Sequence, residues 1–264
     1  GMADVAALSG GDRAYVDALD RLWNDVTRAK FSLTGGVGAR RSGEAFGAPF
    51  ELPNAAVYNE TCAAIAFALW NHRMFLVHGD GAVIDLLERA LYNAILPGIS
   101  LSGDRFFYPN PLEHDGRTRF NQGQAERAPW FGCACCPTNI ARYLAALPGL
   151  IYATRADELF VNLHVASSAK LTLAHTALKV RMQTDAPWDG RVTLTLDPPR
   201  ATRFALNLRV PGWARNRPVP TDLYRHAGPP GAHPRILVAG EPVAVPVERG
   251  FARIERVWNP GDSV

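Results

Sequence analysis

Three of the chain's four cysteines stand within four positions, in the stretch WFGCACCPTN at residues 130–139. Adjacent cysteines such as Cys135 and Cys136 rarely bridge each other, because a disulfide needs a particular Cα separation and torsion angle. A cluster of this density is more typical of a site that binds a metal ion or carries out thiol chemistry. The alternative is that these cysteines pack as small hydrophobic residues in a core.

The fourth cysteine lies in the stretch YNETCAAI, where Glu60 precedes Cys62 by two positions. In an extended or turning segment such neighbours share a side, and a helical pattern begins directly after them. We therefore expect Glu60 and Cys62 at the entrance of a helix. Cys135 and Cys136 likewise precede a helix, with Pro137 suited to its first turn. If the two helix starts converged, their positive ends would favour thiolates.

Glu60, Cys62, Cys135 and Cys136 would together make a plausible ligand set for zinc, with three sulfurs and one carboxylate oxygen. The spacing alone is weak evidence, because more than seventy residues separate the two halves of the set. The sequence also lacks the paired C-x-x-C arrangement of a zinc finger or ribbon. From the residues alone, metal binding, thiol redox chemistry and simple packing of the cysteines all stay open.

The elements that must position these residues are helical in the first half of the chain. A period of 3.6 in the apolar residues is regular in AVIDLLERALYNAIL, whereas ETCAAIAFALWNHRMF is apolar on nearly all sides, as in a helix buried in a bundle. The predicted helices cover residues 13–30, 60–75, 82–96 and 137–153.

The hydrophobic period changes near residue 158, where apolar and polar residues begin to alternate. Short strands at regular spacing are typical of an antiparallel β-sandwich or barrel. We therefore predict a two-domain α+β chain, with a helical domain at residues 3–155 and an antiparallel β-sandwich at residues 156–264. The predicted strands lie at residues 158–166, 169–174, 177–184, 191–197, 203–210, 236–240 and 251–257, and a Pro/Gly-rich loop lies at 228–235.

The composition is that of a globular protein, with 47% hydrophobic residues and a net charge of +3. The arginines are scattered without a basic run, which argues against nucleic acid as the principal partner. We see no signal peptide and no apolar run of membrane-spanning length, so a membrane partner is not expected. Four cysteines in a chain of 264 residues do not make a disulfide scaffold, so we expect reduced thiols and a cytoplasmic location.

Several segments carry motifs that belong together: GEAFGAPFELPNAAVYNETCAAIA, DLLERALYNAILPGISLSGDRFFYPNPLE, WFGCACCPTNIARYLA, APWDGRVTLTL, LNLRVPGWA and RVWNPGD. The E-T-C and C-C-P-x-N motifs, combined with the upstream G-E-x-F-G, are the most specific. On these residues the chain resembles glycoside hydrolase family 127, the β-L-arabinofuranosidases. The resemblance runs from the segment that begins at Ser32 to the last residue.

The resemblance implies a retaining exo-glycosidase with a helical (α/α)6 barrel and appended β-sandwich domains. It makes Glu60, Cys62, Cys135 and Cys136 the ligands of a zinc cofactor. It also implies that Cys135 attacks the anomeric carbon and that Glu44 is the general acid/base, for which we expect partial burial. The substrate would be a glycan that ends in L-arabinofuranose or a related sugar.

Each implied role has a structural alternative. Glu44 could instead cap a helix or pair with Arg40 or Arg41. Three aromatic residues could stack on a sugar or simply pack, namely Tyr58, Trp130 and Phe131. Three histidines could touch sugar hydroxyls or be satisfied core residues, namely His72, His78 and His164. Cys133 has no assigned role and is expected to be structural.

The helical part is shorter than a complete barrel, so we expect a partial chain with about half of the (α/α)6 barrel. Apolar helix faces would then be uncovered, and such faces are typical of protein interfaces, which predicts a homodimer. Three functions from different classes stay open. They are a zinc-dependent retaining glycosidase, a shortened non-catalytic homologue that binds sugar or zinc, and a thiol redox or zinc-storage protein.

Overall fold

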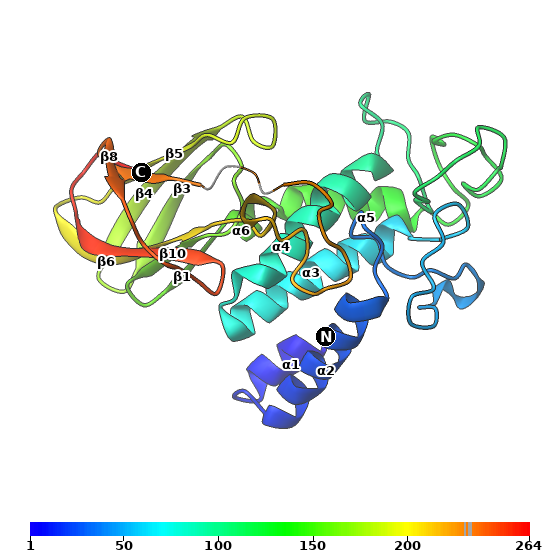
Figure 1. Ribbon diagram of the computed structural model, residues 1–264, viewed down its shortest axis with the longest axis horizontal. Helices are drawn as coiled ribbons and strands as arrows, with labels where there is room; N and C mark the ends of the chain where they lie inside the picture. The colour runs from blue at the N-terminus through cyan, green and yellow to red at the C-terminus, as the bar shows by residue number, and fades with distance from the viewer. Residues whose placement is uncertain (230, 232–233) are drawn as a thin grey trace. The chain divides into compact units, whose positions relative to one another are not determined.

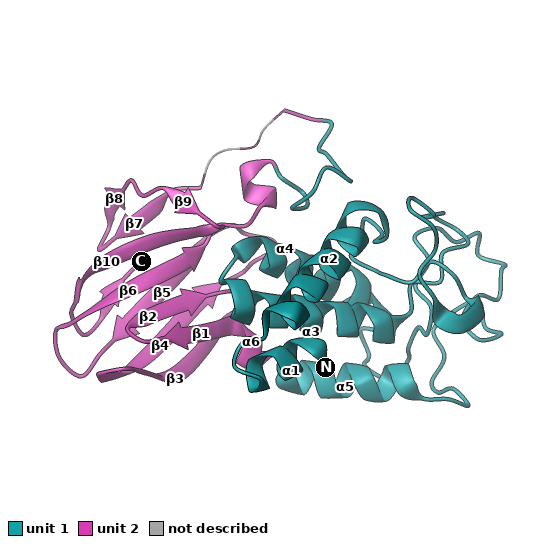
Figure 2. Cartoon of the chain, turned by 90° about the horizontal axis from the view of Figure 1, so that it is seen from below, with its two compact units in different colours: residues 1–146, 217–227 teal, residues 147–216, 228–264 magenta. Residues whose placement is uncertain are grey.

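The computed structural model describes residues 1–229, 231 and 234–264. The chain divides into two compact units, one of residues 1–146 and 217–227 and the other of residues 147–216 and 228–264 (Figure 2). The first unit is helical and the second consists mainly of strands. The two-domain α+β organisation predicted from the change of period is therefore confirmed. Within the described residues, we find no helix with the length and apolar character that a membrane crossing requires.

Apart from the helix Met2–Leu8, which was not predicted, the helices of the first unit follow the predicted periodic segments, and local signals explain several of their ends (Figure 1). Gly79, with a φ of 64°, takes the left-handed conformation that ends α3, and Asp80 then accepts a hydrogen bond from the amide of Ala82 to cap α4. The α-helices are α1 (Met2–Leu8), α2 (Arg13–Ala29), α3 (Thr61–His78), α4 (Gly81–Ala90) and α5 (Cys135–Ala146), with shorter turns at Ser42–Glu44, Leu91–Ile95 and Leu96–Gly98.

One predicted helix ends earlier than its apolar pattern suggested. The segment 137–153 was expected to be one helix, but α5 ends at Ala146 and a short α6 (Pro148–Ile151) follows. Pro148 explains the break, because proline cannot donate the hydrogen bond that would continue α5. The chain then becomes extended at Tyr152, inside the segment we expected to be helical.

Helix α3 forms the centre of the helical unit. Ala64, Ile65 and Ala68 are fully buried, and α3 packs against α1, α4 and α5. A helix in this position has little surface to expose to water, which explains its apolar character on nearly all sides. Its first turn is thereby held in a rigid setting.

Residues 217–227 return from the strand-rich half of the chain to the core of the helical unit. The hydroxyl of Tyr224 donates a hydrogen bond to the carbonyl of Phe31 over 3.0 Å, and its ring lies edge-on to the Phe31 ring. Arg89 donates to the carbonyls of Leu33 and Pro218. The sequence patterns did not indicate this return, which completes a hydrophobic cluster around Phe31.

The described residues of the second unit form three sheets (Figure 1). Each predicted alternating segment contains a strand, but the strand predicted at 158–166 ends at Val161 and four further short strands were not predicted. A five-stranded sheet has the order β1-β2-β6-β10-β9, a four-stranded sheet the order β11-β5-β4-β3, and β7 pairs with β8. The bounds are β1 (Tyr152–Arg155), β2 (Glu158–Val161), β3 (Ser167–Leu173), β4 (Thr176–Thr184), β5 (Val192–Asp197), β6 (Thr202–Arg209), β7 (Ile236–Val238), β8 (Glu241–Val243), β9 (Val247–Glu248), β10 (Phe251–Trp258) and β11 (Asp262–Ser263). Of the predicted loop 228–235, residues 230, 232 and 233 lie outside the described residues.

The expectation of purely antiparallel pairing is wrong for the five-stranded sheet. Strands β2 and β6 run parallel, with Glu158 opposite Ala205 and Val161 opposite Leu208, so this sheet is mixed. An alternating pattern reports which side of a strand is buried but not its direction. The long connection through β3, β4 and β5 brings the chain back in the same direction, as parallel neighbours require.

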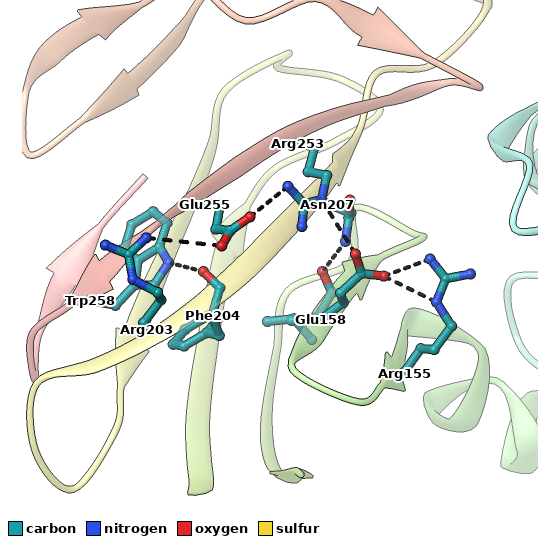
Figure 3. Close-up of polar contacts among 9 residues, drawn as sticks. Arg155, Glu158, Arg203, Phe204, Asn207, Arg253, Glu255 and Trp258 are labelled. Atoms are coloured by element: carbon teal, nitrogen blue, oxygen red, sulfur yellow. Dashed lines mark hydrogen bonds and ion pairs between the residues drawn. The ribbon is translucent and has the colours of Figure 1, made fainter. Parts of the chain in front are cut away.

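The five-stranded sheet has a buried tryptophan in its interior and ion pairs on its surface (Figure 3). Trp258 is fully buried and donates a hydrogen bond to the carbonyl of Phe204 over 3.1 Å. On the surface, Glu158 pairs with Arg155 and with Arg253. Exposed pairs of this kind contribute only about 0–1 kcal/mol each. The stability of the sheet therefore rests mainly on its apolar interior.

Candidate functional site

Four side chains that the sequence singled out meet at one point of the helical unit. One ligand atom from each of Glu60, Cys62, Cys135 and Cys136 lies within 4.8 Å of the others. Glu60 is the N-cap of α3, whereas Cys135 and Cys136 are the first two residues of α5. The predicted convergence of two helix starts is therefore confirmed. One detail differs, because the three cysteines lie within the first helical turns and not before them.

Three distances within this cluster, among Glu60, Cys135 and Cys136, fit the edges of a tetrahedral metal site. Cys135 Sγ and Cys136 Sγ are 3.8 Å apart, and Glu60 Oε1 is 3.5 Å and 3.4 Å from these two sulfurs. Zinc–sulfur bonds of about 2.3 Å and zinc–oxygen bonds of about 2.0 Å give tetrahedral edges of about 3.8 Å and 3.5 Å. The donor set therefore fits a zinc ion in both its chemistry and its spacing.

The donors of the cluster also shift one another's pKa values. The hydrogen bond from Cys136 lowers the pKa of Cys62 to about 7, while burial raises the pKa of Cys135 to about 12. Burial, and then the charge of Glu44, raise the pKa of Glu60. The Cys62 thiol therefore ionises readily, whereas Cys135 and Glu60 favour their neutral forms. Such a group of donors is stabilised when a cation neutralises it.

The entrance to α3 is held by buried hydrogen bonds on both sides of Glu60. The amide of Asn59 donates to the carbonyl of Gly38, and its side chain donates to Ser32 Oγ over 2.8 Å. The amide of Thr61 donates to the carbonyl of Tyr108. A Cβ atom on Gly36 would lie 2.7 Å from Asn59 Cγ, so this position requires glycine. The backbone on either side of Glu60 is thereby fixed.

A buried asparagine holds Tyr108 beside the sulfur of Cys135. The hydroxyl of Tyr108 is 3.0 Å from Cys135 Sγ. Asn121 is fully buried, accepts a hydrogen bond from the amide of Tyr108, and donates to the carbonyls of Phe106 and Glu126. The sequence reasoning missed Tyr108, which lies in a segment quoted for the resemblance but has no informative spacing to the cysteines.

Glu44 lies close to this cluster but is exposed. It ends the short turn Ser42–Glu44, and its Oε1 accepts a hydrogen bond of 3.4 Å from the hydroxyl of Tyr58. The partial burial that we expected for Glu44 is therefore wrong for this chain. The alternative ion pairs are not formed either, since Arg40 binds Glu51 over 2.6 Å and Arg41 donates to Gln122.

The other candidate residues divide into those near the cluster and those away from it. Tyr58 and Phe131 pack against the cysteines, whereas Trp130 is 60% exposed. His72 and His78 lie farther along α3, about 15 Å and 24 Å from Cys62 at 1.5 Å per residue. His164 and Cys133 are not members of the Glu60–cysteine cluster. His164 follows β2 in the strand unit, and Cys133 is exposed.

Two family models match the chain and divide it near the change from helices to strands. Residues 1–149 match the β-L-arabinofuranosidase GH127 catalytic domain, and residues 158–264 match the β-L-arabinofuranosidase GH127 middle domain. The chain is 33% identical over 273 residues to a non-reducing end β-L-arabinofuranosidase from Bifidobacterium longum subsp. longum. That alignment covers 100% of this chain and 38% of the relative, so the chain spans well under half of the relative's length.

Solved structures give the same result. A GH127 β-arabinofuranosidase superposes with a TM-score of 0.90 at 42% identity, over 99% of this chain and 40% of the other. A GH127 β-L-arabinofuranosidase from Geobacillus stearothermophilus T6 superposes with a TM-score of 0.87 at 39% identity, over 99% of this chain and 39% of the other. The chain therefore belongs to glycoside hydrolase family 127.

Proposed function

We propose that the protein is a zinc-dependent retaining glycosidase that releases terminal L-arabinofuranose, or a related sugar, from glycans. The observation that carries this proposal is the convergence of Glu60 with three cysteine sulfurs, against which Tyr58, the hydrogen-bond partner of Glu44, packs. The activity named for the relatives supports the substrate class. Because the chain spans 38% of the matched B. longum relative, the activity of the whole protein is part of the proposal.

Glu60, Cys62, Cys135 and Cys136 would hold the zinc ion, because their ligand atoms lie within 4.8 Å of one another and the distances among Glu60, Cys135 and Cys136 match tetrahedral edges. When bound, zinc would keep the sulfurs ionised near neutral pH and offset the charge of the crowded donors. The hydroxyl of Tyr108, 3.0 Å from Cys135 Sγ, would orient that sulfur towards the sugar.

Cys135 and Glu44 would carry out two displacements. In the first, Cys135 Sγ forms a bond to the anomeric carbon as the glycosidic bond breaks, and Glu44 gives its proton to the departing oxygen. In the second, Glu44 removes a proton from water, the water oxygen bonds to the anomeric carbon, and the sulfur leaves. Two inversions at one carbon retain its configuration.

Hydrolysis of an aryl β-L-arabinofuranoside, measured with metal content, tests this function. We expect one zinc per chain, turnover by the parent protein, and a fall of about 10²–10⁴-fold in Glu44→Gln. Cys135→Ser should abolish turnover, while Cys133→Ser, which alters an exposed thiol outside the cluster, should leave it unchanged. Zinc without turnover would select a non-catalytic sugar- or zinc-binding homologue. A reversible disulfide without sugar affinity would select a thiol redox or zinc-storage protein.

We also infer that the helices belong to an (α/α)6 barrel and that the larger sheets form a β-sandwich. The division into a helical catalytic-type domain at residues 3–155 and a β-sandwich domain at residues 156–264 stays a prediction. The same holds for the homodimer, which sedimentation equilibrium would test, and for the cytoplasmic location.

A further inference from the structure

A groove of about 440 Å³ opens on the helical unit beside the cysteine cluster. Its walls come from the turn around Gln122 and Gln124 and from the segment that leads to α5, which includes Trp130 and Phe131. The mechanism proposed above gives this groove no role.

The groove is connected to both of the residues that we assign to the reaction. At one end, the ring of Phe131 lies edge-on to Tyr108, whose hydroxyl is 3.0 Å from Cys135 Sγ. At the other end, Gln122 Nε2 donates to the hydroxyl of Tyr58, which in turn donates to Glu44. The groove is therefore one side chain away from each of them, with Tyr108 between Phe131 and Cys135 and with Tyr58 between Gln122 and Glu44.

The chemistry of the walls suits a sugar ring. Trp130 is 60% exposed and offers an aromatic face of the kind that covers the apolar face of a carbohydrate. The exposed side chains of Gln122, Gln124 and Glu126 provide amide donors, amide acceptors and a carboxylate acceptor for hydroxyl groups. One aromatic surface with a few polar groups around it is the usual composition of a small-molecule site.

We propose that this groove is the leaving-group subsite, which binds the sugar residue to which the terminal arabinofuranose is attached. The inference rests on the proposed function. Glu44 must protonate the oxygen of the departing group, so that group has to extend from the side of Glu44. Gln122 lines the groove and donates a hydrogen bond to the Tyr58 hydroxyl, which contacts Glu44. The groove therefore lies on the side of the site where Glu44 is found.

The test compares two substrates that differ only in the leaving group. One is methyl β-L-arabinofuranoside, whose methyl group is too small to fill the groove. The other is a disaccharide with a terminal β-L-arabinofuranose. We expect Trp130→Ala to lower kcat/KM for the disaccharide about ten-fold and to leave that for the methyl glycoside within two-fold. Trp130→Phe should restore most of the loss, because a ring is again present.

Two further variants keep the result specific. Gln124→Ala removes a polar side chain that lines the groove, and it should also lower kcat/KM for the disaccharide but not for the methyl glycoside. Trp188→Ala removes a tryptophan that is 93% exposed in the strand unit and should change neither substrate. Equal losses on both substrates, or no loss on either, would overturn the subsite while the hydrolase function stands.

Failure of the proposed function gives a different result. If the parent protein hydrolyses neither substrate, the hydrolase proposal fails, and titration calorimetry with the disaccharide then decides on the groove alone. Binding that Trp130→Ala weakens about ten-fold and Trp188→Ala leaves unchanged would support a sugar site. Absence of binding, or binding that does not depend on Trp130, would overturn it.

Discussion

Glu60 and Cys136 are 76 positions apart in the chain, yet Glu60 Oε1 lies 3.4 Å from Cys136 Sγ. The contact exists only when the first turn of α3 is docked against the first turn of α5. A cation bound by these residues therefore joins two helix starts that the sequence keeps far apart. Its binding free energy adds directly to the free energy of unfolding, because the unfolded chain has no preformed site.

Metal removal should therefore destabilise the protein, and loss of one ligand should mimic it. We expect Cys136→Ser to weaken zinc binding by at least about ten-fold and to lower Tm, because three donors hold the ion less well than four. Metal content by mass spectrometry and thermal unfolding, each with and without chelator, check this.

Cys133→Ser provides the matched control for this prediction. It makes the same substitution three positions before Cys136, on a thiol that is exposed and outside the cluster. Its zinc content and Tm should equal those of the parent protein. Equal metal loss in both variants, or a Tm that does not respond to chelator, would contradict a structural role for the ion.

Asn121→Ala should cost about 3 kcal/mol in the free energy of unfolding. The substitution removes the partner of the buried Tyr108 amide and of the Glu126 carbonyl, whereas the Phe106 carbonyl keeps its bond from the Ala128 amide. Asn93→Ala serves as the control, because Asn93 is exposed and its side chain makes one hydrogen bond, to the carbonyl of Arg89. Urea unfolding of both variants gives the comparison, and similar costs would show that Asn121 is not a structural anchor.

Stability should fall as the pH drops from about 6.5 to about 4 because of His72. Burial, and then the positive charge of Arg73, lower the pKa of His72 to about 4. Within this window the unfolded chain binds a proton on His72 and the native chain does not, so acid favours unfolding. The contribution reaches about 3 kcal/mol at the acid end. The free energy of unfolding of His72→Asn should depend less steeply on pH, and parallel profiles would refute the assignment.

Tyr224→Ala should destabilise the helical unit by about 2 kcal/mol, because the half-buried ring and its bond to the Phe31 carbonyl are both lost. Tyr224→Phe keeps the ring and should cost about 1 kcal/mol. Hydrogen exchange resolved by residue locates the effect: amides near Phe31 should lose protection, while those of β4 and β5 should keep it. Loss confined to the strands would contradict the placement of residues 217–227.

Much of the fold follows from local patterns in the sequence. The apolar period places α2 and α3 within a few residues, and alternation finds β4 and β6. The parallel pairing of β2 with β6 could not be predicted, because alternation carries no direction. The return of residues 217–227 to the helical core was missed for a related reason, since Tyr224 reaches Phe31 from 193 positions away and no local pattern records such a distance.

The candidate site shows the same division. The grouping of Glu60, Cys62, Cys135 and Cys136 was implied by the family resemblance, whereas the residues alone only made it plausible by placing each half near a helix start. Tyr108 escaped notice because its position depends on Asn121, thirteen residues later in an irregular loop. The solvent exposure of Glu44 was also missed, because exposure depends on which segments surround a residue.

The return of residues 217–227 to the helical unit has a practical consequence for protein engineering. The backbone passes between the two units three times, at 146/147, 216/217 and 227/228. A chimaera that replaces everything after residue 146 with the sequence of a relative would also replace residues 217–227. The relative's segment would then have to pack against the hydrophobic cluster around Phe31. A chimaera that keeps the native residues 217–227 together with the helical unit avoids this mismatch. Exchange of the strand-rich unit therefore needs three junctions and not one.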